Sequence, residues 1–87
     1  DRDVRQLAAE SLGKIGPVAK PALPALIQTL QDEDPFVRLH AAYALSLIDP
    51  ARSAEAIPIL KDAKVDQVTG IMVSEALHRI SEATGTK

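Results

Sequence analysis

Residues 21–49 read PALPALIQTLQDEDPFVRLHAAYALSLID and contain most of the information about the architecture. The second half of this stretch, residues 34–49, repeats residues 1–16 at a shift of 33. The apolar identities recur at spacings of four, four and three residues, which places them on one face of an α-helix. The identical pairs are Asp1/Asp34, Val4/Val37, Arg5/Arg38, Ala8/Ala41, Ala9/Ala42, Leu12/Leu45 and Ile15/Ile48.

A second type of helix alternates with the first. Residues 21–30 and 54–63 match at a shift of 34. A weaker third copy of the first helix closes the chain at a shift of 32. Repeats of this length are typical of stacked helix pairs that share one continuous core. The matching positions are Ala22/Ala56, Pro24/Pro58 and Leu26/Leu60 for the second type, and Ala44/Ala76, Leu45/Leu77 and Ile48/Ile80 for the third copy.

These repeats predict an all-α fold, a right-handed α-solenoid of about two and a half repeats formed by residues 1–87 as one domain. Asp34-Pro35 and Asp49-Pro50 each offer a side-chain acceptor followed by a ring suited to the first helical turn. Gly16-Pro17 should end the first helix. Pro24 and Pro58 lie inside the second-type helices and should bend them. We expect five helices, near residues 2–15, 18–31, 35–48, 51–63 and 66–83.

The expected core follows the apolar stripes of all five helices. The first helix has no preceding neighbour, so one side of it should remain exposed. We therefore expect the chain either to belong to a longer array or to associate with a second copy through this helix. The expected core residues are Val4, Ala8, Leu12, Ile15, Leu23, Leu26, Ile27, Leu30, Val37, Ala41, Leu45, Ile48, Ile57, Leu60, Val73, Leu77 and Ile80.

Composition excludes several classes of function. Cysteine is absent, which removes disulfides and thiolate metal sites. The net charge of −2 and the two aromatic residues supply neither a basic face nor stacking platforms for nucleic acid. No apolar run approaches the roughly 20 residues of a membrane span, and no signal peptide is visible. A cytoplasmic protein without nucleic-acid or membrane partners is expected.

Catalytic chemistry has little support. His40 and His78 lie on different predicted helices, without a second imidazole at metal-ligand spacing. The acidic cluster of residues 32–34 lacks the spacing of a calcium loop. No phosphate-binding glycine motif is present. We therefore predict no catalytic residues, no cofactor and no metal, so the protein is not expected to be an enzyme.

The pattern of residues 21–49 resembles a HEAT repeat, in particular the short repeats of phycobilisome-lyase-type proteins. The resemblance covers nearly the whole chain and weakens after Lys64, where Gly70 replaces the arginine of the earlier repeats. In that family an aspartate in the turn between helices pairs with this arginine and forms a ladder along the stack. The resemblance implies an ion pair between Asp32 and Arg38.

The same resemblance implies that the first-type helices line the concave surface. On the predicted outward stripe, the first repeat is polar, whereas the second carries Phe36, Leu39, Tyr43 and Leu47. An exposed apolar strip with a polar surround would suit a protein-binding hot spot. Alternatively, Leu39 and Leu47 simply fill a narrow groove. The expected rim residues are Gln6, Glu10, Lys14, Glu75 and Arg79.

The function expected from this resemblance is a protein–protein interaction scaffold whose partner is another, unidentified protein. One alternative is a subunit of a bilin lyase that acts on phycobiliproteins. A second alternative is a structural spacer in a multidomain protein, which would have no tight partner.

Overall fold

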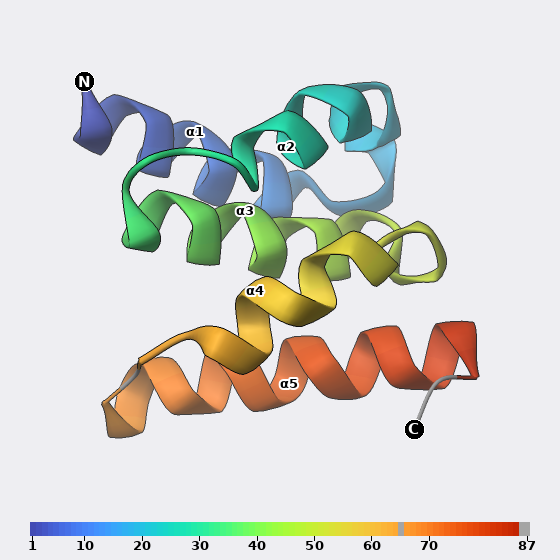
Figure 1. The fold of residues 1–87 in the computed structure, drawn as a ribbon. Helices are drawn as coiled ribbons and strands as arrows, with labels where there is room; N and C mark the ends of the chain where they lie inside the picture. Colours follow the sequence, from blue (N-terminus) through green and yellow to red (C-terminus); the bar gives the residue numbers. More distant parts are fainter. Residues whose placement is uncertain (65, 86–87) are drawn as a thin grey trace.

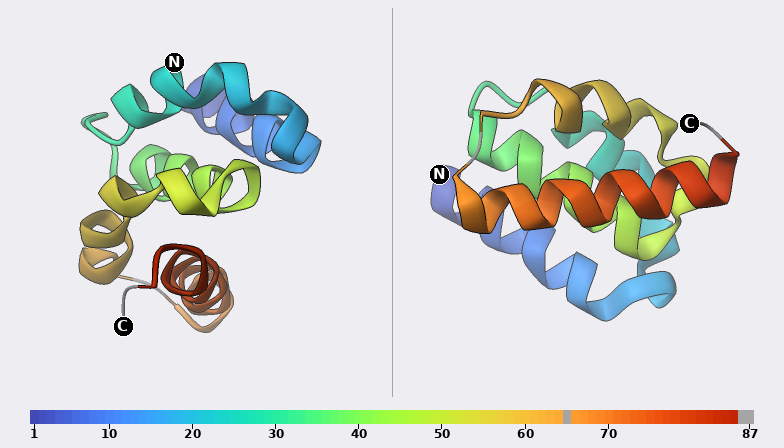
Figure 2. Two further views of the ribbon diagram at one scale, coloured as in Figure 1. Left: turned by 90° about the vertical axis from the view of Figure 1, so that its right-hand side faces the viewer. Right: turned by 90° about the horizontal axis from the view of Figure 1, so that it is seen from below.

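The computed structural model describes residues 1–64 and 66–85, which are 86% helical. The long helices α1 (Arg2–Ile15), α3 (Pro35–Ile48) and α5 (Gln67–Thr84) lie side by side in one layer (Figures 1 and 2). The shorter helices α2 (Leu23–Thr29) and α4 (Ile57–Asp62) form the second layer. Three 3-10 segments lead into the shorter helices: η1 (Gly16–Ala22), η2 (Pro50–Arg52) and η3 (Ala54–Ala56). The all-α prediction is confirmed, and the bounds of α1 and α3 are those expected.

The prediction of five regular helices is wrong in part, because residues 18–31 and 51–63 are not continuous α-helices. A proline has no backbone N–H and interrupts the hydrogen bonds that an α-helix needs. Pro21 lies within η1, whereas Pro24 and Pro58 occupy the first turn of α2 and α4. A backbone N–H in the first turn of an α-helix has no hydrogen-bond partner within the helix. A proline at that position therefore costs no helical hydrogen bond. These two prolines therefore begin short α-helices and do not bend long ones.

Aspartate side chains cap the long helices. The Asp34 carboxylate accepts the backbone N–H of Phe36 at 2.8 Å, and the Asp66 carboxylate accepts that of Thr69 at 2.8 Å. The expected cap at Asp49 is wrong, since its side chain accepts no capping hydrogen bond. The buried hydroxyl of Ser53 instead donates to the carbonyl oxygens of Leu45 and Asp49, at 2.9 and 2.7 Å. This serine thereby links the last turn of α3 to the segment that follows it.

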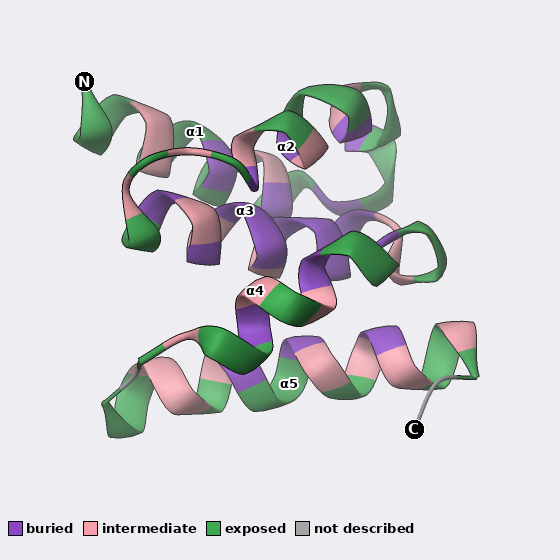
Figure 3. Cartoon of the chain, viewed as in Figure 1, coloured by how far each residue is buried: buried purple, intermediate pink, exposed green. Residues whose placement is uncertain are grey.

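The core centres on α3, which contacts α1, α2, α4 and α5. Figure 3 shows that buried residues occupy most of this helix. Val37, Ala41 and Leu45 are all 0% exposed. Most of the expected core is confirmed, but Val4, Ala8 and Ile15 are exposed and were wrongly assigned to it. Ala8 borders a groove between α1 and α2, and Val4 and Ile15 are 64% and 56% exposed, so identical residues differ in burial between the two repeats.

Gly13 allows α1 to approach α3 closely. A Cβ atom at this position would lie 3.2 Å from the Cα atom of Ala44 and 3.3 Å from the Cδ1 atom of Leu47. Contacts this short with a backbone atom cannot be relieved by a side-chain rotation. The absence of a side chain at Gly13 therefore sets the distance between these two helices.

The two isoleucines at equivalent repeat positions provide a matched test of burial. Ile48→Ala should lower the free energy of unfolding by about 2–5 kcal/mol, because it leaves a cavity at a residue that is 1% exposed. Ile15→Ala, at a residue that is 56% exposed, should change it by no more than about 0.5 kcal/mol. Urea denaturation followed by circular dichroism measures both. Equal losses would contradict this assignment of the core.

Replacing Gly13 tests the close contact between α1 and α3. Gly13→Val should destabilise the protein by about 1–3 kcal/mol, because the new side chain overpacks the contact with Ala44. Ser11→Val introduces the same side chain at an exposed position of the same helix and is the control. Thermal denaturation should show a lower midpoint for the Gly13 variant alone. An equal loss for the Ser11 control would show that the effect of valine does not depend on the contact with Ala44.

Candidate functional site

A forked ion pair links α1 to the turn between α2 and α3. Arg5 donates from Nε to Asp32 Oδ2 at 2.6 Å and from Nη2 to Asp32 Oδ1 at 3.2 Å. The backbone N–H of Asp34 also donates to Asp32 Oδ1, at 2.9 Å. The hydrogen bond from Arg5, helped by that from Asp34, holds the pKa of the Asp32 carboxyl below its usual value. The same bond raises the pKa of Arg5.

The expected ion pair between Asp32 and Arg38 is therefore wrong. Arg38 Nη1 donates to the backbone carbonyl oxygen of Asp32 at 2.7 Å, while the carboxylate faces Arg5. The hydrogen bond from Asp34 helps to hold the carboxylate toward α1. Asp32 thus links one arginine through its side chain and the next through its main chain.

A small groove crosses the three long helices, and we name it the three-helix groove. It encloses about 80 Å³. Tyr43 and Leu47 are half-buried within it, and Glu10 and Lys14 are exposed on its α1 side. These four predicted site residues therefore come together. The full lining comprises Ala9, Glu10, Gly13, Lys14, His40, Tyr43, Ala44, Leu47 and Met72.

Tyr43 connects this groove to α5. Its hydroxyl donates to Glu75 Oε2 at 3.3 Å, and the Arg79 guanidinium lies 5.6 Å from the centre of its ring. Arg79 Nη2 also donates to Glu75 Oε2 at 3.3 Å. Arg79 Nη1 is buried without a hydrogen-bond partner among the described residues. Glu75 and Arg79 thus lie beside Tyr43, as the predicted rim requires.

The remaining two residues of the predicted stripe lie elsewhere. Leu39 is only 4% exposed and belongs to the core, so its assignment as an exposed contact is wrong. Phe36 is 49% exposed, but it lies at the start of α3 beneath the guanidinium of Arg2, which is 5.1 Å from its ring centre. Arg2 also pairs with Asp34 at 3.0 Å. Phe36 is therefore separated from the three-helix groove.

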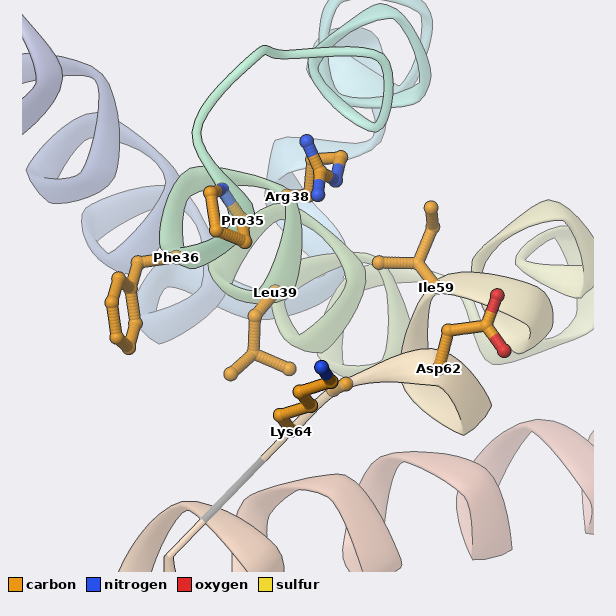
Figure 4. Close-up of a pocket in the computed structure, with 8 residues that line it drawn as sticks. Pro35, Phe36, Arg38, Leu39, Ile59, Asp62 and Lys64 are labelled. Carbon is orange, nitrogen blue, oxygen red and sulfur yellow. The ribbon is translucent and has the colours of Figure 1, made fainter.

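A larger groove lies between the start of α3 and the end of α4, and we name it the α3–α4 groove (Figure 4). It encloses about 490 Å³. Both apolar and charged side chains line it, and the repeat stripe did not predict it as a site. Its lining includes Phe36, Arg38, Leu39, Ile59, Asp62 and Lys64.

Sequence reasoning missed His40 and Met72, which occupy equivalent positions of α3 and α5 at the shift of 32. His40 Nδ1 lies 2.8 Å from the carbonyl oxygen of Phe36, which can only accept, so this nitrogen carries a proton. In the neutral ring Nε2 then accepts from the Gln6 side-chain amide, 3.5 Å away. His40 thus links α3 to α1 through its hydrogen bond with Gln6. His40 stands four residues after Phe36 and three before Tyr43, so helical spacing would have placed it on the face of Tyr43.

A comparison with protein-family models identifies HEAT repeats over residues 1–80. The chain belongs to the HEAT repeat family. HEAT repeat domains typically act as protein-interaction scaffolds and are usually non-catalytic. No curated protein and no solved structure matches the chain.

Within residues 1–64 and 66–85, no group of three or more His, Cys, Asp or Glu side chains is placed to hold a metal ion. Over the same residues, none of the helices combines the length and the apolar character that crossing a membrane requires.

The ion pair between Arg5 and Asp32 should make stability depend on pH. The folded state lowers the pKa of Asp32, so the pair contributes fully above the unfolded value of about 3.9 and is lost as the pH falls through the lower folded value. Asp32→Asn should therefore be less stable than the parent at pH 7. This difference should shrink as the pH falls below about 4.

Urea denaturation at a series of pH values measures this effect. Glu33→Gln is the matched control, because Glu33 makes no ion pair among the described residues. A stability difference for Asp32→Asn that stays constant from neutral to acid pH would show that the carboxylate charge plays no part.

Proposed function

We propose that this protein is a binding module whose three-helix groove holds a segment of another protein against Tyr43 and Leu47. The observation that carries the proposal is the position of Tyr43, half-buried at the junction of α3 and α5 with charged side chains around it. Partly buried aromatic residues surrounded by polar groups are the usual centres of binding energy at protein interfaces.

The size of the groove supports a protein ligand. Small-molecule pockets usually enclose about 300–1,000 Å³, whereas the three-helix groove encloses about 80 Å³. This space suits a single apolar side chain of a partner, with the rest of the partner lying across α1 and α5. It gives no support to a tetrapyrrole ligand at this position.

Charges on the two sides of the groove would orient the partner. Glu10 and Lys14 are exposed on α1, and Glu75 is exposed on α5. Arg79 is held over Tyr43 with one donor unsatisfied, so a partner that draws its guanidinium outward would also release a buried polar group. Alternating charges on the rim favour a partner segment of mixed charge over one of a single sign.

A pull-down from lysate of the source organism tests the proposal. The parent protein should retain a specific partner, and Tyr43→Ser/Leu47→Ser should retain at least about tenfold less, as expected for loss of a hot spot of about 1.4 kcal/mol or more. Val18→Ser is the matched control, because it removes an apolar side chain that is 82% exposed outside the groove. Matching circular dichroism must accompany each variant.

A second variant keeps the test decisive if the double serine variant unfolds. Glu10→Lys/Lys14→Glu reverses two exposed charges with little effect on packing, and it should also reduce retention of the partner. Equal retention by all variants would exclude the groove as the binding site. An empty pull-down with the parent protein would favour a structural spacer.

A further inference from the structure

The α3–α4 groove is distinct from the three-helix groove and has no part in the function proposed above. Comparison of the two repeats shows that a carboxylate of the first repeat is replaced at this groove. The capping residues Asp34 and Asp66 align α3 with α5 at a shift of 32. Asp32 lies two residues before the first cap, and Lys64 lies two residues before the second. A lysine thus stands where the first repeat carries the carboxylate of its ion pair.

Among the described residues, the arginine of the second repeat consequently pairs with no carboxylate. Arg5 lies four residues after the capping residue Asp1 and donates hydrogen bonds from two nitrogens to Asp32. Arg38 also follows its cap by four residues, but within residues 1–64 and 66–85 it forms no ion pair. Its one hydrogen bond among these residues runs from Nη1 to the carbonyl oxygen of Asp32, at 2.7 Å. This bond anchors a half-buried guanidinium beside the groove, and its other donors remain available.

We propose that the α3–α4 groove binds a peptide segment of another protein that carries one aspartate or glutamate beside an apolar residue. The carboxylate of this segment takes the place at Arg38 that Asp32 takes at Arg5. A planar guanidinium matches a carboxylate through two parallel hydrogen bonds, and a fixed guanidinium loses little freedom on binding. The apolar neighbour lies mainly against the half-buried Ile59, beside Leu39, which also lines the groove but is only 4% exposed.

The local charges favour a single carboxylate. Arg38 and Lys64 contribute two positive charges to the groove lining, and Asp62 contributes one negative charge (Figure 4). A ligand with one negative charge balances this set, whereas a run of acidic residues would meet repulsion from Asp62. The volume of about 490 Å³ leaves room for the acidic and the apolar side chain of this segment beside each other.

Titration of the ¹⁵N-labelled protein with acetyl-Leu-Asp-Leu-amide, followed by NMR, tests this proposal. Saturable shifts should appear in the backbone amides of residues 36–39 and 59–64. The matched ligand acetyl-Leu-Asn-Leu-amide has the same shape without the charge, and it should bind at least about fivefold more weakly. Equal binding of the two tripeptides, or no saturable shift with the acidic one, would overturn the proposal.

Variants of the two cations separate the contributions. Arg38→Gln should weaken binding of the acidic tripeptide to the level of the neutral one. Lys64→Asp should abolish binding, because it supplies Arg38 with a carboxylate from the chain itself, as in the first repeat. Lys64→Gln removes the charge without supplying a carboxylate and should cause a smaller loss. Parent-like affinity of Lys64→Asp would contradict the proposed role of Arg38.

The outcome is independent of the three-helix groove. Tyr43→Ser/Leu47→Ser should bind the acidic tripeptide as the parent does, and Arg38→Gln should still retain the partner proposed for Tyr43. If the tripeptide fails but that partner binds, only the α3–α4 groove is excluded. If the tripeptide binds but no partner is captured through Tyr43, only the function proposed for the three-helix groove fails.

Discussion

The packing of α3 against its neighbours is the interaction on which the other features depend. Helix α3 contacts α1, α2, α4 and α5, and the missing side chain at Gly13 lets α1 reach its backbone. Burial of α3 on several sides fixes both its position and its rotation. Tyr43 is thereby directed toward α5, while Arg38 and the largely buried Leu39 lie on the side of the α3–α4 groove. Both grooves result from one rigid helix with different neighbours on its two sides.

The ion pair between Arg5 and Asp32 joins the two layers in the first repeat, and the described part of the second repeat has no equivalent of it. Asp32 binds Arg5 through its carboxylate and Arg38 through its carbonyl oxygen, so one turn holds α1 and α3 together. In the second repeat Lys64 occupies the corresponding position, and the larger groove lies there. An identical arginine therefore serves stability in one repeat and is available to a ligand in the next.

Periodicity and caps predicted α1 and α3 well, because their apolar identities and aspartate caps are local features of the chain. The 3-10 segments were missed, since spacing alone does not show whether Pro24 begins a helix or interrupts one. Glu10, Lys14, Tyr43 and Leu47 were correctly grouped, because they share the repeat stripe. The burial of Leu39 depends on the path of α4 in three dimensions. Whether the Asp32 carboxylate pairs with Arg5 or with Arg38 depends on the path of the turn between α2 and α3. Val4 and Ile15 show that identical repeat residues need a neighbour before they become core.

Both grooves are built on α3, which should therefore be the most stable element of the structure. Native-state hydrogen exchange, measured for each backbone amide by NMR, tests this claim most directly, because it reports the local free energy of opening. The amides of Ala41–Ile48 should exchange only through global unfolding, whereas those near the start of α1 and the end of α5 should exchange faster. Exchange in the middle of α3 at the rate of the outer helices would contradict the account.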